Sequence, residues 1–288
     1  ITGYQNRISI KNLESILVDN LRASSKGLNI IQPLYAECGL DPAKMEKVKF
    51  PTALISDDAF VTNYKTSIKT IDKKFQNAAV EKLLELEFEQ LTADRLEYRS
   101  IFTTLENHNP KEYVLSDYKQ MPVNLNRIID DTIYNYAELV AELKESDKVL
   151  NIIYVIESVK NLCSSIGYVY LNEIQQRTKK QIPHYIKIST TLMLILIRSY
   201  LSTAYLLKKQ VTNQLLDIII QRIITTYKKA LIDYGTSVGI LAAQCISEPM
   251  TQYVLDSKHR SGGQGGTKTN AIVRLQEILG AKDTETMK

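Results

Sequence analysis

The sequence predicts a mainly α protein, and three observations support this fold class. Apolar residues recur at helical spacing over most of the 288 residues. The chain has 11 glycines and 7 prolines, which leave long stretches without a helix breaker. Alternation of apolar and polar residues, which indicates a half-buried strand, is sparse. We therefore expect many helices and few, short strands.

The composition is that of a chain that buries a sizeable core. Hydrophobic residues make up 44% of the sequence, enough for one large domain or two smaller ones. The formal charge of +4 is mild, which weakens the hypothesis of a free-standing nucleic-acid binder. The longest apolar run, residues 192–197, is too short to cross a bilayer, so no membrane contact is expected. The 3 cysteines form no CxxC pair and predict neither a zinc site nor disulfides.

The beginning of the chain predicts an internal piece of an intracellular protein. It has neither an initiator methionine nor a signal-peptide pattern.

The first predicted helix covers about residues 5–22, with Ile8, Leu13 and Ile16 on one face. A turn is predicted at 39–42, and a short strand around Val48 and Phe50.

Helical patterning becomes strong from about Val61 and continues to residue 106. The sequence at 107–110, Asn-His-Asn-Pro, interrupts it. Further helices are predicted over residues 125–145, 149–172, 188–208 and 212–234.

Glycine is concentrated near the end of the chain. Clustered glycines permit positive φ and lose much conformational entropy when the backbone adopts one conformation, so they predict a flexible tip. The tip lies between an amphipathic segment that starts at Pro249 and another over residues 271–279, and the arrangement predicts a helical hairpin. The glycines of the tip are Gly262, Gly263, Gly265 and Gly266.

The segment before the tip carries the polar groups of the candidate site. Proline is tolerated in the first turn of a helix, so we expect a helix to begin at Pro249. Helical spacing then places an amide, a branched apolar group, a carboxylate and an imidazole on one stripe, followed by a basic residue. Such a stripe suits a base, a ribose and a phosphate, although polar stripes are usually solvated faces. These residues are Gln252, Leu255, Asp256, His259 and Arg260.

Three other site hypotheses are weak. The glycine cluster before Thr267-Lys268-Thr269 differs from a phosphate-binding loop, because Thr267 replaces the glycine before the lysine and no strand precedes it. Asp57 and Asp58 are more simply solvated acids than a metal site. The 3 histidines have no metal-ligand spacing, so no metal is expected to bind this chain.

Four motifs resemble the largest subunit of multisubunit DNA-dependent RNA polymerase. Residues 239–252, GILAAQCISEPMTQ, resemble the family signature that leads into the trigger loop. Thr2, Gly3 and Tyr4, with Arg7, resemble the C-terminal half of the bridge helix. Residues 29–35 with 39–41 resemble the segment after it, and residues 121–129 resemble a motif of the foot. The motifs follow the order of the family.

The resemblance implies roles for the predicted stripe. In the family, the position of Leu255 packs on the nucleobase, and the positions of Gln252 and Asp256 lie near the ribose. The position of His259 approaches the β-phosphate and assists nucleotidyl transfer by positioning or as an acid. The neighbouring Arg260 is expected to contact the nucleotide as well.

The sequence departs from cellular members of the family at several positions. Asp256 stands where they carry Asn or Arg, and a carboxylate there repels a triphosphate while still accepting from ribose hydroxyls. Lys258 replaces an aromatic residue, and Cys245 and Ser247 replace Ser and Gly. Residues 255–261, LDSKHRS, are most similar to enzymes of large cytoplasmic DNA viruses, asfarvirus-like or poxvirus-like.

The resemblance also implies a cofactor that this chain does not hold by itself. Nucleotidyl transfer uses two Mg²⁺ ions, which the family binds with an aspartate-rich loop that is absent here. We therefore expect the chain to supply hairpin closure and translocation, and the isolated chain to be inactive. Expected partners are the DNA template, the RNA transcript, NTP, and the second-largest and smaller polymerase subunits.

The expected organisation has three segments. Residues 1–50 hold the bridge-helix half and the following core segment, residues 51–228 a helical foot-like insertion, and residues 229–288 the cleft segment with the trigger loop. The alternative function is a non-catalytic helical scaffold that docks other subunits. The expected location is the host cytoplasm, in a viral factory, and the virion for a viral enzyme, and the nucleus otherwise.

Overall fold

The computed structural model describes residues 2–20, 23–72, 75–108, 116–142, 149–171 and 181–259, without the side chains of residues 2, 5, 70, 104–108 and 249–259. The described part is mainly helical, which confirms the predicted fold class. The chain divides into two compact units. We call Ile1–Tyr35 with Ile232–Lys288 the terminal unit, and Ala36–Leu231 the helical unit. The three-segment organisation stays a prediction.

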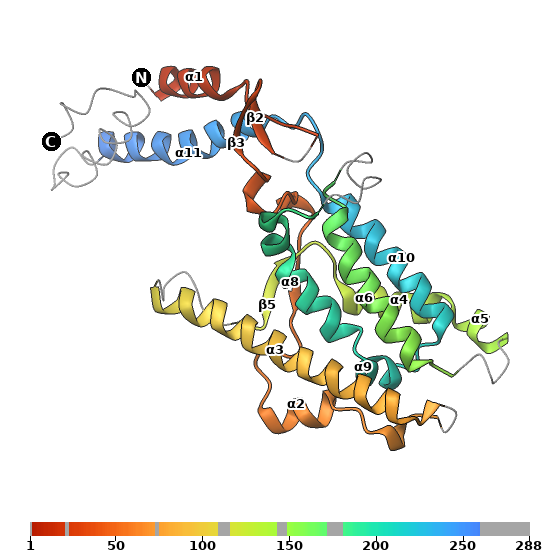
Figure 1. Cartoon of the computed structure of the whole chain (residues 1–288). Helices are drawn as coiled ribbons and strands as arrows, with labels where there is room; N and C mark the ends of the chain where they lie inside the picture. The colour runs from red at the N-terminus through yellow and green to blue at the C-terminus, as the bar shows by residue number, and fades with distance from the viewer. Residues whose placement is uncertain are drawn as a thin grey trace. The chain divides into compact units, whose positions relative to one another are not determined.

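The terminal unit joins the two ends of the chain. Helix α1 (Thr2–Leu13) lies along helix α11 (Val238–His259) (Figure 1). After α1 comes an antiparallel sheet of order β1-β2-β3, formed by β1 (Leu17–Val18), β2 (Ser24–Lys26) and β3 (Asn29–Gln32). Val18, Ile232 and Val238 form its buried cluster, with Ile16 and Tyr35 packed against it.

The prediction of one helix over residues 5–22 is wrong in its second half. Helix α1 ends at Leu13, and Leu17 and Val18 form a strand instead. The Val18 amide donates to the Thr236 carbonyl at 3.1 Å, and Gly235 donates back to the Val18 carbonyl at 2.8 Å. These bonds reach residues more than two hundred positions away, so helical periodicity in a local window does not reveal them.

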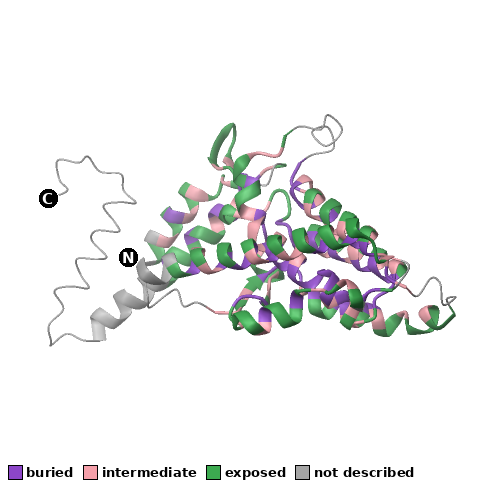
Figure 2. Cartoon of the chain, turned by 60° about the horizontal axis from the view of Figure 1, so that its bottom comes forward, coloured by how far each residue is buried: buried purple, intermediate pink, exposed green. Residues whose placement is uncertain are grey.

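The helical unit is built around helix α8, which packs against helices on several sides. Eight of its residues are buried, among them Met193, Leu196 and Ile197. Figure 2 shows buried residues gathered where the helices of this unit face one another. The unit contains α2 (Asp57–Tyr64), α3 (Ala78–His108), α4 (Leu125–Asn135), α5 (Ala137–Glu142), α6 (Ile152–Tyr168), α8 (His184–Tyr200), α9 (Thr203–Lys208) and α10 (Asn213–Ala230).

Side-chain caps define where several helices begin. Asn124 accepts from the Arg127 amide at the start of α4, and Asn151 accepts from two amides at the start of α6. Thr212 accepts from the Leu215 amide at the start of α10. Each cap satisfies an amide that has no partner within its helix, and such a bond is worth about 1 kcal/mol.

Two predicted helices are divided. The stretch 125–145 is divided at Tyr136 into α4 and α5, and the stretch 188–208 is divided at Leu201 and Ser202 into α8 and α9. The helical pattern from Val61 is interrupted as well, because residues 65–67 are extended before a 3-10 turn, Ile68–Thr70, and α3 begins at Ala78. Ile71, in the linker between α2 and α3, is buried with Val80 and Leu84 of α3, so this linker contributes to the core.

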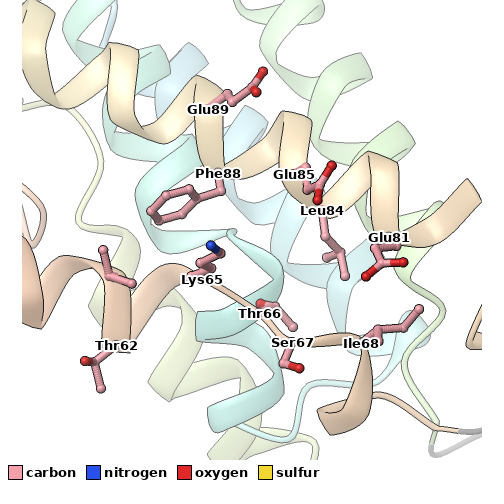
Figure 3. Close-up of a pocket in the computed structure, with 11 residues that line it drawn as sticks. Thr62, Lys65, Thr66, Ser67, Ile68, Glu81, Leu84, Glu85, Phe88 and Glu89 are labelled. Atoms are coloured by element: carbon pink, nitrogen blue, oxygen red, sulfur yellow. The ribbon is translucent and has the colours of Figure 1, made fainter. Parts of the chain in front are cut away.

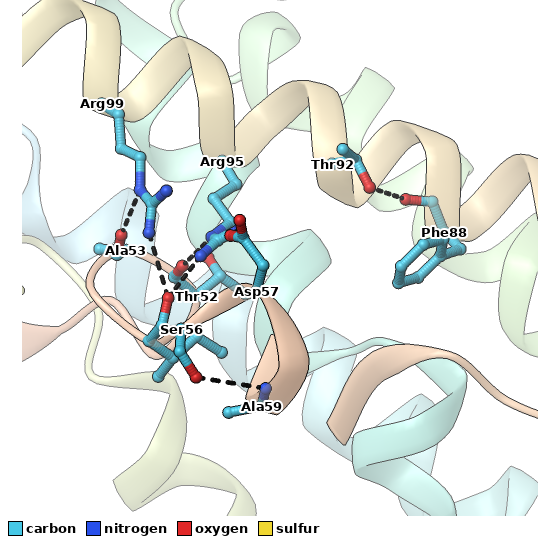
Figure 4. Close-up of polar contacts among 10 residues, drawn as sticks. Thr52, Ala53, Ser56, Asp57, Ala59, Phe88, Thr92, Arg95 and Arg99 are labelled. Carbon is cyan, nitrogen blue, oxygen red and sulfur yellow. Dashed lines mark hydrogen bonds and ion pairs between the residues drawn. The ribbon is translucent and has the colours of Figure 1, made fainter. Parts of the chain in front are cut away.

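A pair of arginines on α3 fixes the loop before α2 (Figure 4). The nearly buried Arg95 donates to the carbonyls of Thr52 and Ile55 and to Asp57 Oδ1, the last at 2.6 Å. One turn later, Arg99 donates to the Ala53 carbonyl at 2.8 Å. The Arg95 guanidinium also lowers the pKa of the Asp57 carboxyl. Asp57 therefore has a structural partner rather than being only solvated.

The predicted strand near Val48 is confirmed. Strand β4 (Glu46–Lys49) pairs antiparallel with β5 (Tyr118–Met121), so that Val48 lies opposite Lys119. Val48 is buried, as is Phe50 directly after the strand. Among the helices that the structure describes, none is both long and apolar enough to span a membrane.

Candidate functional site

The candidate site is the helix pair α1–α11, and α1 presents two different faces. Asn6, Ser9, Ile10 and Leu13 recur at helical spacing and are buried or half-buried. Tyr4, on the other side, is 68% exposed. Helix α1 therefore packs on one stripe and leaves an outer face open to other molecules.

Small residues form the buried stripe of α11. Gly239, Ala243 and Ser247 are buried at intervals of one helical turn, while Gln244 and Glu248 beside them are exposed. The Ser247 hydroxyl donates to the Ala243 carbonyl at 2.6 Å, so its polarity is satisfied within the helix. Small side chains allow two helix backbones to approach closely.

Gly239 is the point of closest approach. A Cβ atom at this position would lie 1.9 Å from the Leu13 carbonyl oxygen and 2.9 Å from Ile16 Cβ. The Gly239 amide donates to the Ile16 carbonyl at 3.1 Å, which ties the first turn of α11 to the segment between α1 and β1. No side chain larger than hydrogen fits without a shift of the backbone.

One buried polar atom of α1 has no partner in the part of the chain that the structure describes. It is Asn6 Oδ1, on the half-buried stripe of the helix. A buried acceptor without a hydrogen bond is costly, and such groups concentrate at functional positions. Sequence analysis did not identify Asn6, and it included Gly239 only as the first residue of the motif 239–252. A glycine inside a helix is nevertheless a signal of close packing.

Comparison with known proteins identifies the family. Residues 1–288 match the family RNA polymerase Rpb1, domain 5. The chain belongs to the Rpb1 domain 5 family. It is 39% identical over 285 residues to the DNA-directed RNA polymerase RPB1 homologs of African swine fever virus isolates from Kenya and from Pretoriuskop, South Africa. These matches cover 99% of the chain but 18% of each relative.

These comparisons confirm the predicted resemblance to the largest polymerase subunit and to an asfarvirus-like enzyme. The motif at 239–252 lies within α11. The prediction that a helix begins at Pro249 is wrong, because α11 begins at Val238 and continues through this proline. The turns before it already form a helix that packs on α1, and this packing offsets the loss of one backbone hydrogen bond at proline.

The predicted nucleotide-contacting stripe is placed only in part. Gln252, Leu255, Asp256 and His259 belong to the helical backbone of α11, so their positions recur on one stripe. Their side chains lie outside the described residues. Arg260, the tip glycines Gly262, Gly263, Gly265 and Gly266, and the predicted second arm over 271–279 lie outside them as well.

The predicted bridge-helix residues all fall in α1. Tyr4 and Arg7 are exposed, and a Cβ built on Gly3 would meet nothing within 4 Å apart from its chain neighbours and the backbone of α1 itself. The side chain of Thr2 lies outside the described residues. Around the described residues, no group of three or more His, Cys, Asp or Glu side chains is placed to hold a metal ion.

Strongly shifted pKa values occur in the helical unit instead. Burial raises the pKa of the Cys163 thiol to about 11, next to the ion pair between Arg198 and Asp94. Burial also raises the pKa of Tyr200 to about 12. Tyr200 donates a hydrogen bond to the Lys49 carbonyl, and Arg198 binds Asp94, so these groups make structural contacts inside the helical unit.

Proposed function

We propose that this chain forms the mobile part of the active centre of a DNA-dependent RNA polymerase largest subunit. In this proposal α1 is the C-terminal half of the bridge helix, and α11 with the glycine-rich residues after it is the trigger loop. The observation that carries the proposal is the close pairing of α1 with α11 through Gly239, in a chain of the Rpb1 domain 5 family. Closure of the loop on the incoming NTP would exclude water and align the triphosphate.

The predicted stripe on α11 would contact the base, the ribose and the phosphates of the nucleotide. Leu255 would pack on the base, Gln252 and Asp256 would lie near the ribose, and His259 with Arg260 would approach the phosphates. An imidazole suits the phosphate end, because its ordinary pKa lies near physiological pH. The exposed outer face of α1, with Tyr4 and Arg7, would face the nucleic acid and assist translocation.

The chemistry would depend on groups outside this chain. The two Mg²⁺ ions of nucleotidyl transfer would be held by an aspartate-rich loop elsewhere in the subunit. We therefore expect the isolated chain to incorporate no nucleotide. The partners would be template DNA, transcript, NTP and the other polymerase subunits, in a viral factory of the host cytoplasm.

Single-nucleotide addition by the complete polymerase tests the trigger-loop role. We expect His259→Ala in preassembled elongation complexes to slow addition by about 10²–10⁴-fold, the usual range for acid–base or positional assistance. Leu255→Ala should also slow addition and reduce discrimination between nucleotides. Ser257→Ala, on the same helix but off the stripe, is the matched control and should react at the normal rate.

The scaffold alternative predicts a different result. If α11 only packs, both variants lower thermal stability or assembly, and complexes that do assemble add nucleotides normally. Normal rates for both His259→Ala and Leu255→Ala would refute the trigger-loop role and favour the scaffold.

A further inference from the structure

A groove on the helical unit is lined by apolar side chains and has carboxylates along the α3 side (Figure 3). It lies between α2, the extended linker after it and the first turns of α3, and has a volume of about 750 Å³. Leu84 and Phe88 of α3 contribute apolar surface, and Val61 of α2 adds a side chain that is 45% exposed. An exposed valine beside a phenylalanine is surface that water solvates poorly.

Carboxylates line one side of this groove at a regular interval. Glu81, Glu85 and Glu89 follow one another every four residues along α3, and all are exposed. Among the described residues, none of the three has an ion pair or a side-chain hydrogen bond. Like charges at this spacing destabilise a helix, so a cationic partner would relieve a repulsion that is built into α3.

The opposite side of the groove offers little compensation. Lys65 is the one basic residue among those that line it, and its ammonium lies 5.8 Å from the centroid of the Phe88 ring. Thr66, in the linker, has a buried hydroxyl oxygen without a hydrogen-bond partner in the described part of the chain. The groove thus combines excess negative charge, apolar side chains and an unused hydroxyl.

We propose that this groove binds a basic amphipathic segment of another polymerase subunit. Lysines or arginines spaced four residues apart on a helical segment rise about 6 Å per step, the same interval as the glutamates of α3. Apolar residues on the same segment would pack on Leu84, Phe88 and Val61, as amphipathic helices do in a groove. Nucleic acid is disfavoured, because phosphates would meet three carboxylates.

Photo-crosslinking in the complete polymerase tests the proposal. A photoreactive phenylalanine replaces Thr62, which lines the groove from α2, and mass spectrometry identifies the attached peptide. We expect a peptide of another subunit that carries Lys or Arg at helical spacing with apolar residues between them. The double variant Glu85→Lys, Glu89→Lys should reduce the yield about tenfold, because charge complementarity across an interface suppresses like-charged partners.

Matched variants separate charge from folding. Glu97→Lys reverses a single charge on an exposed part of α3 outside the groove and should leave the crosslink intact. If the double reversal prevents assembly, Glu85→Gln with Glu89→Gln removes the charge without adding repulsion and should still lower the yield. Absence of a crosslink to another subunit, attachment to an acidic segment or to nucleic acid, or a yield that both double variants leave unchanged would overturn the proposal.

The groove and the α1–α11 pair are tested separately. The groove inference does not rest on the trigger-loop role, because its residues belong to α2, the linker and α3. Nucleotide addition by complexes carrying the double variant should remain normal once they are assembled.

Discussion

At the scale of the residue, Gly239 decides how closely α1 and α11 pack. Its missing side chain leaves room for the Leu13 carbonyl, which would lie 1.9 Å from a Cβ atom. To make room for a Cβ atom, the backbone at Leu13 must move, because the nearest atom is a backbone oxygen and not the end of a flexible side chain. The residue therefore sets the geometry of the helix pair.

The variant Gly239→Ala should loosen this pair. We expect a loss of about 1–3 kcal/mol in the opening free energy of α1 and α11, the range for overpacking a tight contact, measured by amide hydrogen exchange. Gly3→Ala is the control: nothing outside α1 lies within 4 Å of its Cβ, and alanine favours a helix by up to about 1 kcal/mol. Equal exchange in both variants would show that the close contact does not constrain α11.

A second residue-scale feature is the tyrosine pair inside the helical unit. The Tyr170 hydroxyl donates to the Cys38 carbonyl at 2.9 Å, and the Tyr227 hydroxyl lies 2.6 Å from the Tyr170 hydroxyl. Since Tyr170 has one proton, Tyr227 donates to it. Burial, and the neighbouring Tyr170, raise the pKa of Tyr227 well above its ordinary value of 10.0.

This pair predicts a loss of stability at alkaline pH. A tyrosine of the unfolded chain ionises near pH 10, whereas Tyr227 of the folded chain keeps its proton. The contribution of Tyr227 to the unfolding free energy is therefore complete below pH 10 and is lost as the pH rises above it. Tyr227→Phe should cost about 1 kcal/mol at pH 7 for the lost hydrogen bond. Above pH 10 the unfolding free energy of the Tyr227→Phe variant should fall less steeply with pH than that of the wild type. The two slopes should differ by about 1.4 kcal/mol per pH unit.

Denaturant unfolding of the wild-type and variant chains between pH 7 and pH 11 measures both effects. Tyr134→Phe is the control, because Tyr134 is 84% exposed. Parallel pH profiles for the wild type and Tyr227→Phe would contradict the assignment.

At the scale of the element, α3 holds α2 through a buried arginine as well as through an apolar cluster. Arg95 satisfies the buried Thr52 and the Ile55 carbonyls, stacks its guanidinium 4.8 Å from the centroid of the Phe60 ring, and pairs with Asp57. Phe60 in turn packs with Tyr64 and Leu91. The start of α2 therefore depends on one long side chain from another helix.

Removal of this side chain should release α2. Arg95→Ala leaves the carbonyl of the buried Thr52 without its donor and removes the partner of Asp57. We expect a cost of about 2–3 kcal/mol in unfolding free energy, with faster hydrogen exchange in α2. Arg127→Ala removes an exposed bidentate contact to Glu46 and should cost at most about 1 kcal/mol. Similar losses in the two variants would mean that burial does not strengthen the Arg95 contacts.

At the scale of the whole molecule, the two units differ in how they are assembled from the chain. The helical unit is one continuous stretch, Ala36–Leu231, with buried clusters of its own. The terminal unit needs both ends, because Val18 packs with Ile232 and Val238. The units should therefore differ in their ability to fold as separate polypeptides.

We expect a polypeptide of residues 36–231 to fold by itself. It should show helical circular dichroism and a cooperative thermal transition, since its core lies within the stretch. A polypeptide of residues 1–35 should remain largely unfolded, because a helix of about 12 residues without its partner is marginal in water. A non-cooperative melt of residues 36–231 would show that this unit depends on the terminal one.

The sequence by itself determined the fold class, two helices of the middle of the chain and the family. Helices α6 and α10 follow from local apolar periodicity, and Asn151 and Thr212 mark their first turns. The order of four motifs sufficed for the polymerase family. These features depend on residues that are neighbours in the sequence, so local periodicity and short motifs reveal them.

Only the tertiary structure decided the remaining features. Leu17 and Val18 form a strand because their backbone partners lie near residue 236, and α11 passes through Pro249 because the preceding turns pack on α1. The close approach at Gly239 likewise depends on a distant segment of the chain, and the groove beside Phe88 depends on how α2 and the linker pack on α3. A local sequence window contains none of these partners, and the free energy of such contacts exceeds the weak preferences of the segments themselves.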